Sequence, residues 1–267
     1  MKTVSIVIPV YNDAGFLWET IQCAKAQTYA PVEIIVVNDG STDAETLNIL
    51  SNVEQAGIKV LHKQNGHLAS ARNFGIQYAQ GEFILPVDCD DKFASDFLFK
   101  AVPILEKNKD IGAVSCFVQR FGKDNKLWKP LGGGVQDFLF KNQCSSFGLF
   151  RKKDWKDIGG YDESMKYGAE DWDFWISLTK LGRTIQIIPE SLFYYRQHES
   201  SMLKDVTYLN REKVIRHLVS KHSDIYQEGI IKAMATHKLL FLGIKLPTSF
   251  FLKLYVKKLL GKELYFE

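Results

Sequence analysis

Three aspartates lie within four positions at the end of an apolar run, in the segment LPVDCDDKF at residues 85–93. Asp88, Asp90 and Asp91 carry like charges, which raise one another's pKa unless a cation or hydrogen-bond donors offset them. Carboxylates at this spacing suit a hard divalent cation, Mg²⁺ or Mn²⁺, shared with phosphate oxygens. They equally suit a helix N-terminus with solvated acids before residues 93–98. Spacing alone supports both interpretations.

A second acidic pair, Glu170 and Asp171, begins a helical segment that continues with Trp172, Phe174 and Trp175. Acids in the first turn of a helix are favoured by the helix dipole, by about 0.3–1 kcal/mol, and this alone explains their presence. The aromatic neighbours, however, predict a partly buried site. A carboxylate held in such a site can act as a general base toward a hydroxyl.

Polar side chains at three further places each have two interpretations. Asp39, in the loop NDGSTD, either helps to cap a helix or accepts a hydrogen bond from a planar base. Arg72 lies on a helical segment, where it either faces solvent or contacts pyrophosphate or a base. A lone histidine is more often structural than a ligand, so the residues by themselves favour a structural His198.

Strands alternate with helices along the first 110 residues. The predicted strands are 4–8, 33–37, 58–62 and 82–87, and the predicted helices are 14–27, a segment ending near 54, and 67–81. Continuous apolar strands indicate a parallel α/β sheet with helices on both faces. Ligands of such sheets bind outside the carboxyl ends of the strands, where NDGSTD and DCDD both fall. Pro86 must lie at a strand end or a bulge.

The second half of the chain alternates less regularly. A strand is predicted at 112–121, a loop at 131–135, and two short strands at 184–189 and 192–196. From about residue 206 the pattern is helical. We therefore expect one domain at 1–205 and a helical segment at 206–267.

Composition limits the function classes. Hydrophobic residues make up 46% of the 267 residues and charged residues 24%, as in soluble globular proteins. A net charge of +3 is too small to indicate a nucleic-acid partner. Four cysteines without paired spacing predict neither a disulfide framework nor a zinc site. The N-terminal apolar run is too short for a signal peptide, and no apolar stretch spans a bilayer, so we expect a cytoplasmic protein.

The chain resembles the inverting family 2 glycosyltransferases, which have the GT-A nucleotide-sugar-binding fold. Seven segments carry the resemblance in the family's order and spacing: SIVIPVYN at 5–12, VVNDGSTD at 36–43, ARNFG at 71–75, VDCDD at 87–91, GGYDE at 159–163, AEDWDFW at 169–175 and YRQHESS at 195–201. The resemblance implies a doubly wound, mostly parallel sheet. It does not extend over the C-terminal segment.

The resemblance also implies a donor site. Asp39 matches the acid that meets the nucleotide base, usually uracil, in a pocket lined by the backbone around Pro9 and Tyr11. Arg72 matches a residue near the base, and Asp88 matches the acid near the ribose. The implied donor is a nucleotide-diphosphate sugar, with a UDP-sugar favoured.

The implied metal is Mn²⁺ or Mg²⁺. Asp90 matches the direct metal ligand of the family's D-x-D motif, and His198 matches a second metal ligand, which reverses the structural interpretation. Arg196 and Ser201 match residues that hold the diphosphate. Cys89 and Pro86 differ from the commoner residues of the family, but neither change removes a functional group.

Asp171 matches the catalytic base, with Glu170 as its neighbour. The implied reaction moves a sugar to the hydroxyl of a glycan or lipid-linked acceptor, in the synthesis of cell-envelope polysaccharide. One alternative is a sugar nucleotidyltransferase, which the segments around Asp171 and His198 argue against. The other is a non-catalytic relative that binds sugar nucleotides, which the intact Asp90, Asp171 and His198 argue against.

The C-terminal stretch 237–262 alternates apolar patches with lysines. One interpretation is a basic amphipathic segment on the cytoplasmic face of an anionic membrane, where each lysine adds about 1 kcal/mol. The other is a helical hairpin that packs on the domain or on another subunit, as in a homo-oligomer. The sequence supports the two equally.

Overall fold

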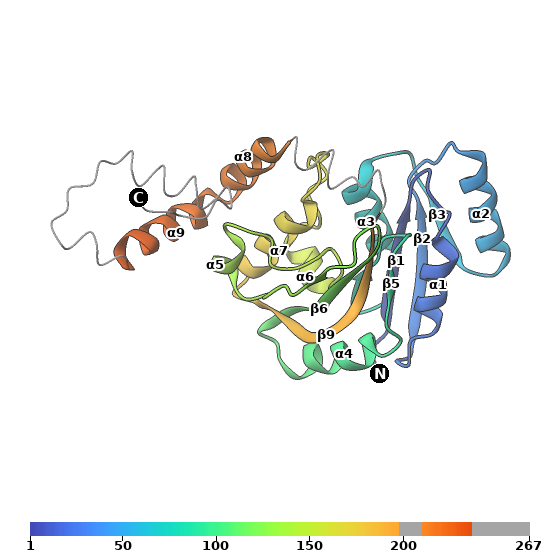
Figure 1. The fold of residues 1–267 in the computed structure, drawn as a ribbon, viewed down its shortest axis with the longest axis horizontal. Coiled ribbons are helices and arrows are strands. Elements are labelled where there is room, and N and C mark those ends of the chain that lie inside the picture. Colours follow the sequence, from blue (N-terminus) through green and yellow to red (C-terminus); the bar gives the residue numbers. More distant parts are fainter. Residues whose placement is uncertain (198–209, 237–267) are drawn as a thin grey trace.

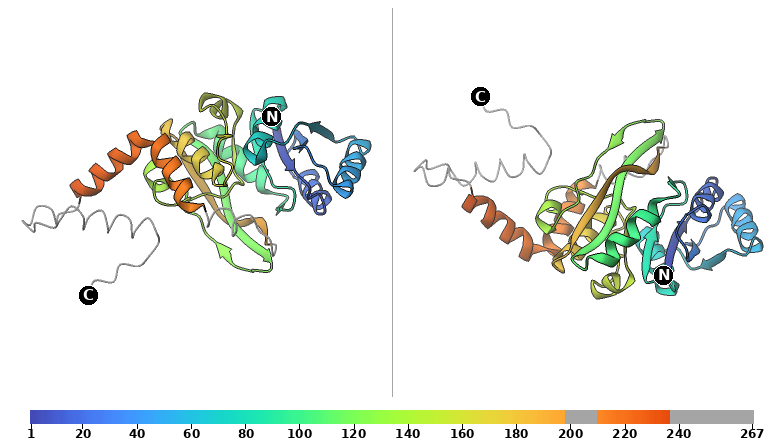
Figure 2. Two further views of the ribbon diagram at one scale, coloured as in Figure 1. Left: turned by 90° about the horizontal axis from the view of Figure 1, so that it is seen from above. Right: turned by 90° about the horizontal axis from the view of Figure 1, so that it is seen from below.

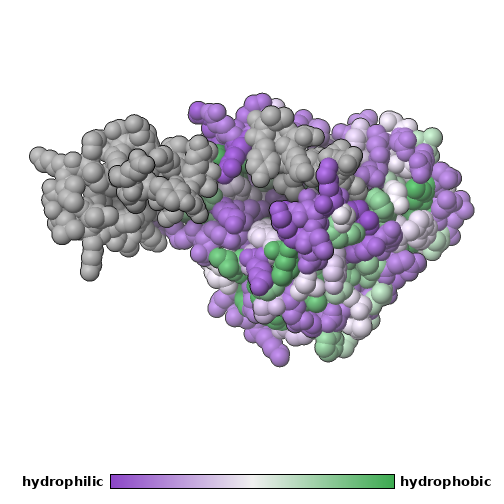
Figure 3. Space-filling model, viewed as in Figure 1, coloured by the Kyte–Doolittle hydropathy of each residue, from purple (hydrophilic) through white to green (hydrophobic). Residues whose placement is uncertain are grey.

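The computed structural model describes residues 1–197 and 210–236 (Figure 1). His198, Ser201 and the stretch 237–262 therefore lie outside the described residues. Within the described ranges, no helix has both the length and the apolar character needed to cross a bilayer. The face drawn in Figure 3 is mostly hydrophilic, and its apolar residues form small separate patches.

A single mixed sheet organises the fold. Its strands are β1 (Val4–Val10), β2 (Val32–Asn38), β3 (Lys59–His62), β4 (Phe83–Pro86), β5 (Lys92–Phe93), β6 (Ile111–Gly122), β7 (Leu127–Trp128), β8 (Leu149–Arg151) and β9 (Thr184–Gln197). They lie in the order β3-β2-β1-β4-β8-β6-β9-β5, and β7 pairs with β6. The first four strands are all parallel, as predicted, whereas β8 is antiparallel to both β4 and β6.

Helices cover both faces of the sheet. They are α1 (Leu17–Lys25), α2 (Ala44–Gln55), α3 (His67–Tyr78), α4 (Phe97–Lys107), α5 (Val135–Phe138), α6 (Lys152–Asp157), α7 (Glu170–Lys180), α8 (Arg211–Lys221) and α9 (Ser223–Thr236). Successive residues of β1 point to opposite faces. Ile6 and Ile8 join a core with α1, α2 and α4, while Val7 joins a second core with α3 and α7. This arrangement confirms the predicted α/β class with a doubly covered sheet.

Two predictions about proline-containing strands had different outcomes. Pro86 is the last residue of β4, as predicted. The two short strands predicted at 184–189 and 192–196 are wrong, because the structure has one strand, β9, of 14 residues. The pairing of β9 with β6 shifts register near Cys116 and Phe117. Pro189, which has no N–H to donate, lies inside β9, and the irregular pairing accommodates it.

The helices α8 and α9 lie at the end of the molecule opposite to β1, β2 and β3 (Figure 2). Val214 and Leu218 of α8 and Tyr226 of α9 are buried in the same core as α7. This described part of the predicted C-terminal segment therefore packs against the helix that begins with Glu170 and Asp171.

The close approach of α3 to the sheet depends on Gly75. A Cβ at this position would meet Cγ1 of Val7 and would lie 2.8 Å from Cγ2 of Val37. We predict that Gly75→Ala lowers the free energy of unfolding by about 1–3 kcal/mol, because α3 must move away from the two buried strands β1 and β2. Urea denaturation measures the change. Gly15→Ala is the control, since nothing lies within 4 Å of a Cβ at Gly15. Equal stability of the two variants would contradict the prediction.

Candidate active site

Arg72 of α3 joins the two acidic clusters that the sequence separates. Its Nη2 donates to Oδ1 of Asp88 at 2.8 Å, and its Nη1 donates to Oε1 of Glu170 at 2.5 Å. The guanidinium is almost completely buried. Burial alone would lower the pKa of Arg72, but the two carboxylates raise it above its ordinary value, so the group stays charged. The side chain predicted to lie near a nucleotide base therefore bridges the end of β4 and the start of α7.

The strand-end acids differ in exposure. Asp88 and Asp90 are partly exposed, whereas Asp91 is fully buried. Oδ1 of Asp91 accepts from the backbone N–H of Arg196 at 2.8 Å, and Oδ2 is buried without a hydrogen-bond partner. Burial first, and then the charges of Asp90 and Asp88, raise the pKa of Asp91 well above its ordinary value. Burial and the neighbouring carboxylates thus disfavour the charged form of Asp91, an effect that a bound cation would oppose.

Arg196 stabilises the turn that contains Asp90 and Asp91. Its Nε donates to the carbonyl oxygen of Asp90 at 2.8 Å, and its Nη2 pairs with Glu19 at 2.8 Å. The guanidinium carbon lies 3.7 Å from the ring centre of Phe16. Thr20 of α1 donates to the carbonyl oxygens of this turn as well. The residue predicted to hold a diphosphate thus already contacts the turn that contains Asp90.

Asp39 follows β2 at the same edge of the sheet and is 3% exposed. Its Oδ1 accepts from Nζ of Lys63 at 2.7 Å and from the backbone N–H of Gly66 at 3.0 Å. Nδ2 of Asn65 donates to its backbone carbonyl at 3.0 Å. Tyr11 is 51% exposed, while Pro9 lies within β1. Sequence reasoning missed Lys63 and Asn65, although both directly follow β3 at this edge.

Asp171 is held by two neutral donors. Its Oδ2 accepts from Nδ2 of Asn142 at 2.9 Å, and its Oδ1 accepts from the backbone N–H of Trp172 at 2.8 Å. Loss of solvation, followed by the charge of Glu170, raises the pKa of Asp171 to about 7. A carboxylate that titrates near neutral pH is suited to general-base chemistry. Sequence reasoning missed Asn142, because no motif covers the loop that contains it.

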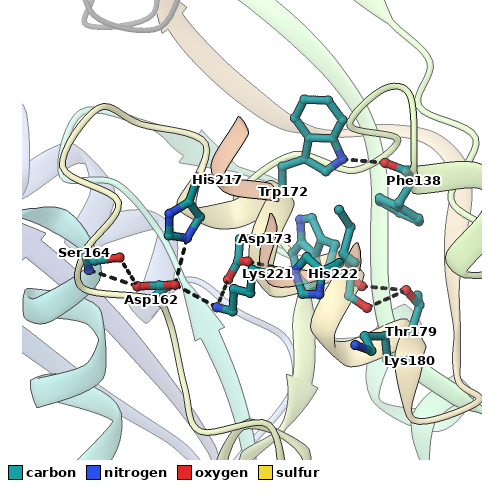
Figure 4. Close-up of polar contacts among 12 residues, drawn as sticks. Phe138, Asp162, Ser164, Trp172, Asp173, Thr179, Lys180, His217, Lys221 and His222 are labelled. Carbon is teal, nitrogen blue, oxygen red and sulfur yellow. Dashed lines mark hydrogen bonds and ion pairs between the residues drawn. The ribbon is translucent and has the colours of Figure 1, made fainter. Parts of the chain in front are cut away.

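A separate cluster of two aspartates and a histidine, residue types that can bind a metal ion, lies near α7 and α8 (Figure 4). Asp162, Asp173 and His217 have ligand atoms within 4.8 Å of one another. However, Nζ of Lys221 lies 2.8 Å from Oδ2 of both aspartates. The ammonium group already offsets their charge, so this cluster is an ion-pair network and not the predicted metal site.

Two family models together match most of the chain. Residues 5–165 match the model described as Glycosyl transferase family 2, and residues 119–223 match the model described as Glycosyltransferase like family 2. An uncharacterised glycosyltransferase of Rickettsia typhi is 32% identical over 215 residues, which cover 74% of this chain and 64% of that protein. The chain spans 36–64% of the length of four such curated relatives.

Two solved structures share the fold. Staphylococcus aureus TarS in complex with UDP-GlcNAc has a TM-score of 0.65 and 22% identity, over 77% of this chain and 61% of that chain. The mannosyltransferase PcManGT from Pyrobaculum calidifontis, in complex with GDP-Man and Mn²⁺, has a TM-score of 0.59 and 18% identity, over 96% and 80%. At these identities the likeness establishes the architecture, which is that of the GT-A fold.

The contact between Asn142 and Asp171 leads to a measurable change. We predict that Asn142→Ala raises the pKa of Asp171 further, by about one pH unit, because the charged carboxylate loses a hydrogen bond. A pH titration of ¹³C-labelled aspartate carboxyl groups by NMR measures the pKa. Asn125→Ala, at an exposed position, is the control and should leave this titration unchanged. An unchanged pKa in Asn142→Ala would show that Asn142 does not stabilise the charged form.

Proposed function

Because the chain belongs to glycosyltransferase family 2, we propose that it transfers a sugar from a nucleotide-diphosphate sugar to an acceptor hydroxyl, with inversion at the anomeric carbon. The main support for this proposal is the two ion pairs of Arg72. One buried guanidinium holds both Asp88, on the proposed donor side, and Glu170, beside the proposed base. Acids from distant parts of the chain thus meet where a donor and an acceptor would have to meet.

Asp171 is the proposed general base. Its raised pKa leaves a substantial ionised fraction at neutral pH and makes it a stronger proton acceptor than an ordinary carboxylate. Asn142 and the backbone N–H of Trp172 fix the orientation of its two oxygens. As the acceptor hydroxyl attacks the anomeric carbon, its proton passes to Asp171. The bond to the nucleoside diphosphate breaks in the same displacement, so no covalent enzyme intermediate is needed.

The acidic turn after β4 fits a divalent cation. Its donor set is oxygen-rich, and Oδ2 of Asp91 is a buried oxygen without a hydrogen-bond partner. Asp90 would hold the cation, together with His198. A bound Mg²⁺ or Mn²⁺ would offset the charge that gathers on the departing diphosphate. Arg196 would keep the turn in place through its contact with the carbonyl oxygen of Asp90.

A UDP-sugar is the proposed donor. The complex of TarS with UDP-GlcNAc and the family's usual preference for uracil support it. In this proposal Asp39 accepts from the base, and Lys63, now paired with Asp39, lies at the edge of the base pocket. The proposed acceptor is a glycan or lipid-linked hydroxyl of a cell-envelope polysaccharide, which the membership of glycosyltransferase family 2 supports.

A panel of nucleotide-sugars, incubated with the protein, Mn²⁺ and glycan acceptors, tests the reaction class. Release of UDP together with a glycosylated acceptor supports sugar transfer. Release of pyrophosphate would identify a nucleotidyltransferase instead. Binding without turnover, measured as a rise in melting temperature with the nucleotide-sugar, would identify a non-catalytic relative.

The role of Asp171 gives a prediction on rate. Asp171→Asn is nearly isosteric but cannot take a proton at neutral pH, so kcat should fall by about 10²–10⁴-fold while UDP-sugar affinity is kept. Steady-state kinetics and calorimetric titration measure the two quantities. Asp157→Asn, at an exposed position on α6, is the matched control. Wild-type turnover in Asp171→Asn, combined with an inactive Glu170→Gln, would transfer the role to Glu170.

The acidic turn gives a prediction on metal. Asp90→Ala should abolish transfer while the fold is kept, because Asp90 is a partly exposed residue of a loop outside the core. Excess EDTA should abolish transfer by the wild-type protein, and added Mn²⁺ should restore it. Circular dichroism checks the fold of the variant. Full activity in EDTA would rule out the metal-dependent mechanism.

A further inference from the structure

Four consecutive side chains in the first turn of α7, residues 170–173, each have a polar partner on a different part of the chain. The partners are Arg72 of α3 for Glu170, Asn142 for Asp171, the carbonyl oxygen of Phe138 in α5 for Trp172, and Lys221 of α8 with the adjoining His222 for Asp173. The first three lie on the sheet domain. The fourth set comes from the C-terminal helices, which the proposed mechanism does not use.

The contact of Asp173 with the end of α8 is a buried ionic one. Asp173 is fully buried and His222 is 2% exposed. Oδ1 of Asp173 lies 2.9 Å from Nε2 of His222, and Oδ2 lies 2.8 Å from Nζ of Lys221 (Figure 4). A charge buried at this depth is strongly destabilising without its partner, so Asp173 ties the end of α8 to the first turn of α7.

The same end of α8 also holds the loop that leads into α7. Oδ2 of Asp162 lies 2.8 Å from Nζ of Lys221 and 3.0 Å from Nε2 of His217. Burial would raise the pKa of Asp162, but hydrogen bonds from Lys221, from Ser164 and from His217 lower it well below its ordinary value. Lys221 therefore bridges the loop and the helix that follows it.

The junction between loop and helix is conformationally demanding. Ala169, directly before Glu170, has φ of 65°, in the left-handed region that residues with a Cβ rarely adopt. Such a conformation persists when the surrounding contacts over-determine it. Asp162 lies before Ala169 in the chain and Asp173 lies after it, so Lys221 holds the chain on both sides of the strained residue. Val214 and Leu218 of α8 support this arrangement from the core.

We propose that α8 is a positioning element for Asp171: Asp173, Lys221 and His222 fix the orientation of the first turn of α7, and with it the carboxylate that faces the acceptor. This inference rests on the proposed function. It makes residues 211–222 part of the machinery that sets the rate, although none of them touches the substrates. Loss of the contact should misplace the base while the proposed base pocket around Asp39 stays intact, because Asp39 is held by Lys63, Asn65 and Gly66 and not by α7 or α8.

Asp173→Asn keeps the shape of the side chain but removes its charge. We expect kcat to fall on the order of tenfold to hundredfold, with KM for the UDP-sugar and UDP affinity unchanged. The matched control is Asp224→Asn, which breaks the exposed pair between Asp224 and Lys180 at the other end of α7 and should leave kcat unchanged. A parallel loss of kcat and UDP affinity would indicate general destabilisation and would overturn the proposal.

Lys221 is the site of a second test, in case Asp173→Asn does not fold. The side chain of Lys221 is 35% exposed, so its substitution disturbs the core less than a change at the fully buried Asp173. Lys221→Met should lower kcat as Asp173→Asn does, and Lys221→Arg, which can still bridge two carboxylates, should retain more of it. Wild-type kcat in both Asp173→Asn and Lys221→Met would overturn the proposal.

An NMR measurement that needs no substrate tests the positioning role of α8 independently of the proposed function. The side-chain amide of Asn142 donates to Asp171, so its ¹⁵N NMR signal reports where Asp171 lies. This signal should move in Asp173→Asn and Lys221→Met but not in Asp224→Asn. A wild-type protein that transfers no sugar would refute the proposed function alone, whereas an unmoved Asn142 signal would refute the positioning role.

Discussion

The buried guanidinium of Arg72 is the constraint on which the site depends. A cation in the interior needs carboxylate partners, and removal of one partner from a buried pair typically costs about 3–5 kcal/mol. The partners here, Asp88 and Glu170, are 16 and 98 residues away in the chain. Satisfying one charge therefore brings together the end of the parallel strand β4 and the helix α7, which comes after the antiparallel strand β8 in the chain. The site lies where the two meet.

Two acids at this edge of the sheet, Asp39 and Asp91, differ in their surroundings. Asp39 accepts from Lys63, Asn65 and Gly66, so its charge is already well stabilised. Asp91 is buried with one oxygen unpartnered, an environment that favours a cation nearby. The fold thus turns similar residues into distinct groups.

The sequence predicted the parts of this fold that have a local signal. Continuous apolar strands and the turn residues after them located β1 to β4, and the strand-end rule placed Asp39 and Asp88 on one edge. The three residues of β8 carry no periodicity, and their place between β4 and β6 is decided by tertiary pairing. The contact of Asn142 could not be predicted for the same reason. The amide lies in a loop without a motif, and only the folding of this loop against α7 brings it to Asp171.

The three acids in the first turn of α7 have different partners. Glu170, Asp171 and Asp173 all benefit from the helix dipole, but they also repel one another. Glu170 is paired with the cationic Arg72, and Asp173 with the cationic Lys221. Asp171 accepts hydrogen bonds from the side-chain amide of Asn142 and from the backbone N–H of Trp172, both of which are neutral. Burial and the nearby charge of Glu170 therefore keep the pKa of Asp171 raised to about 7, although the charge of Arg72 lowers it in part.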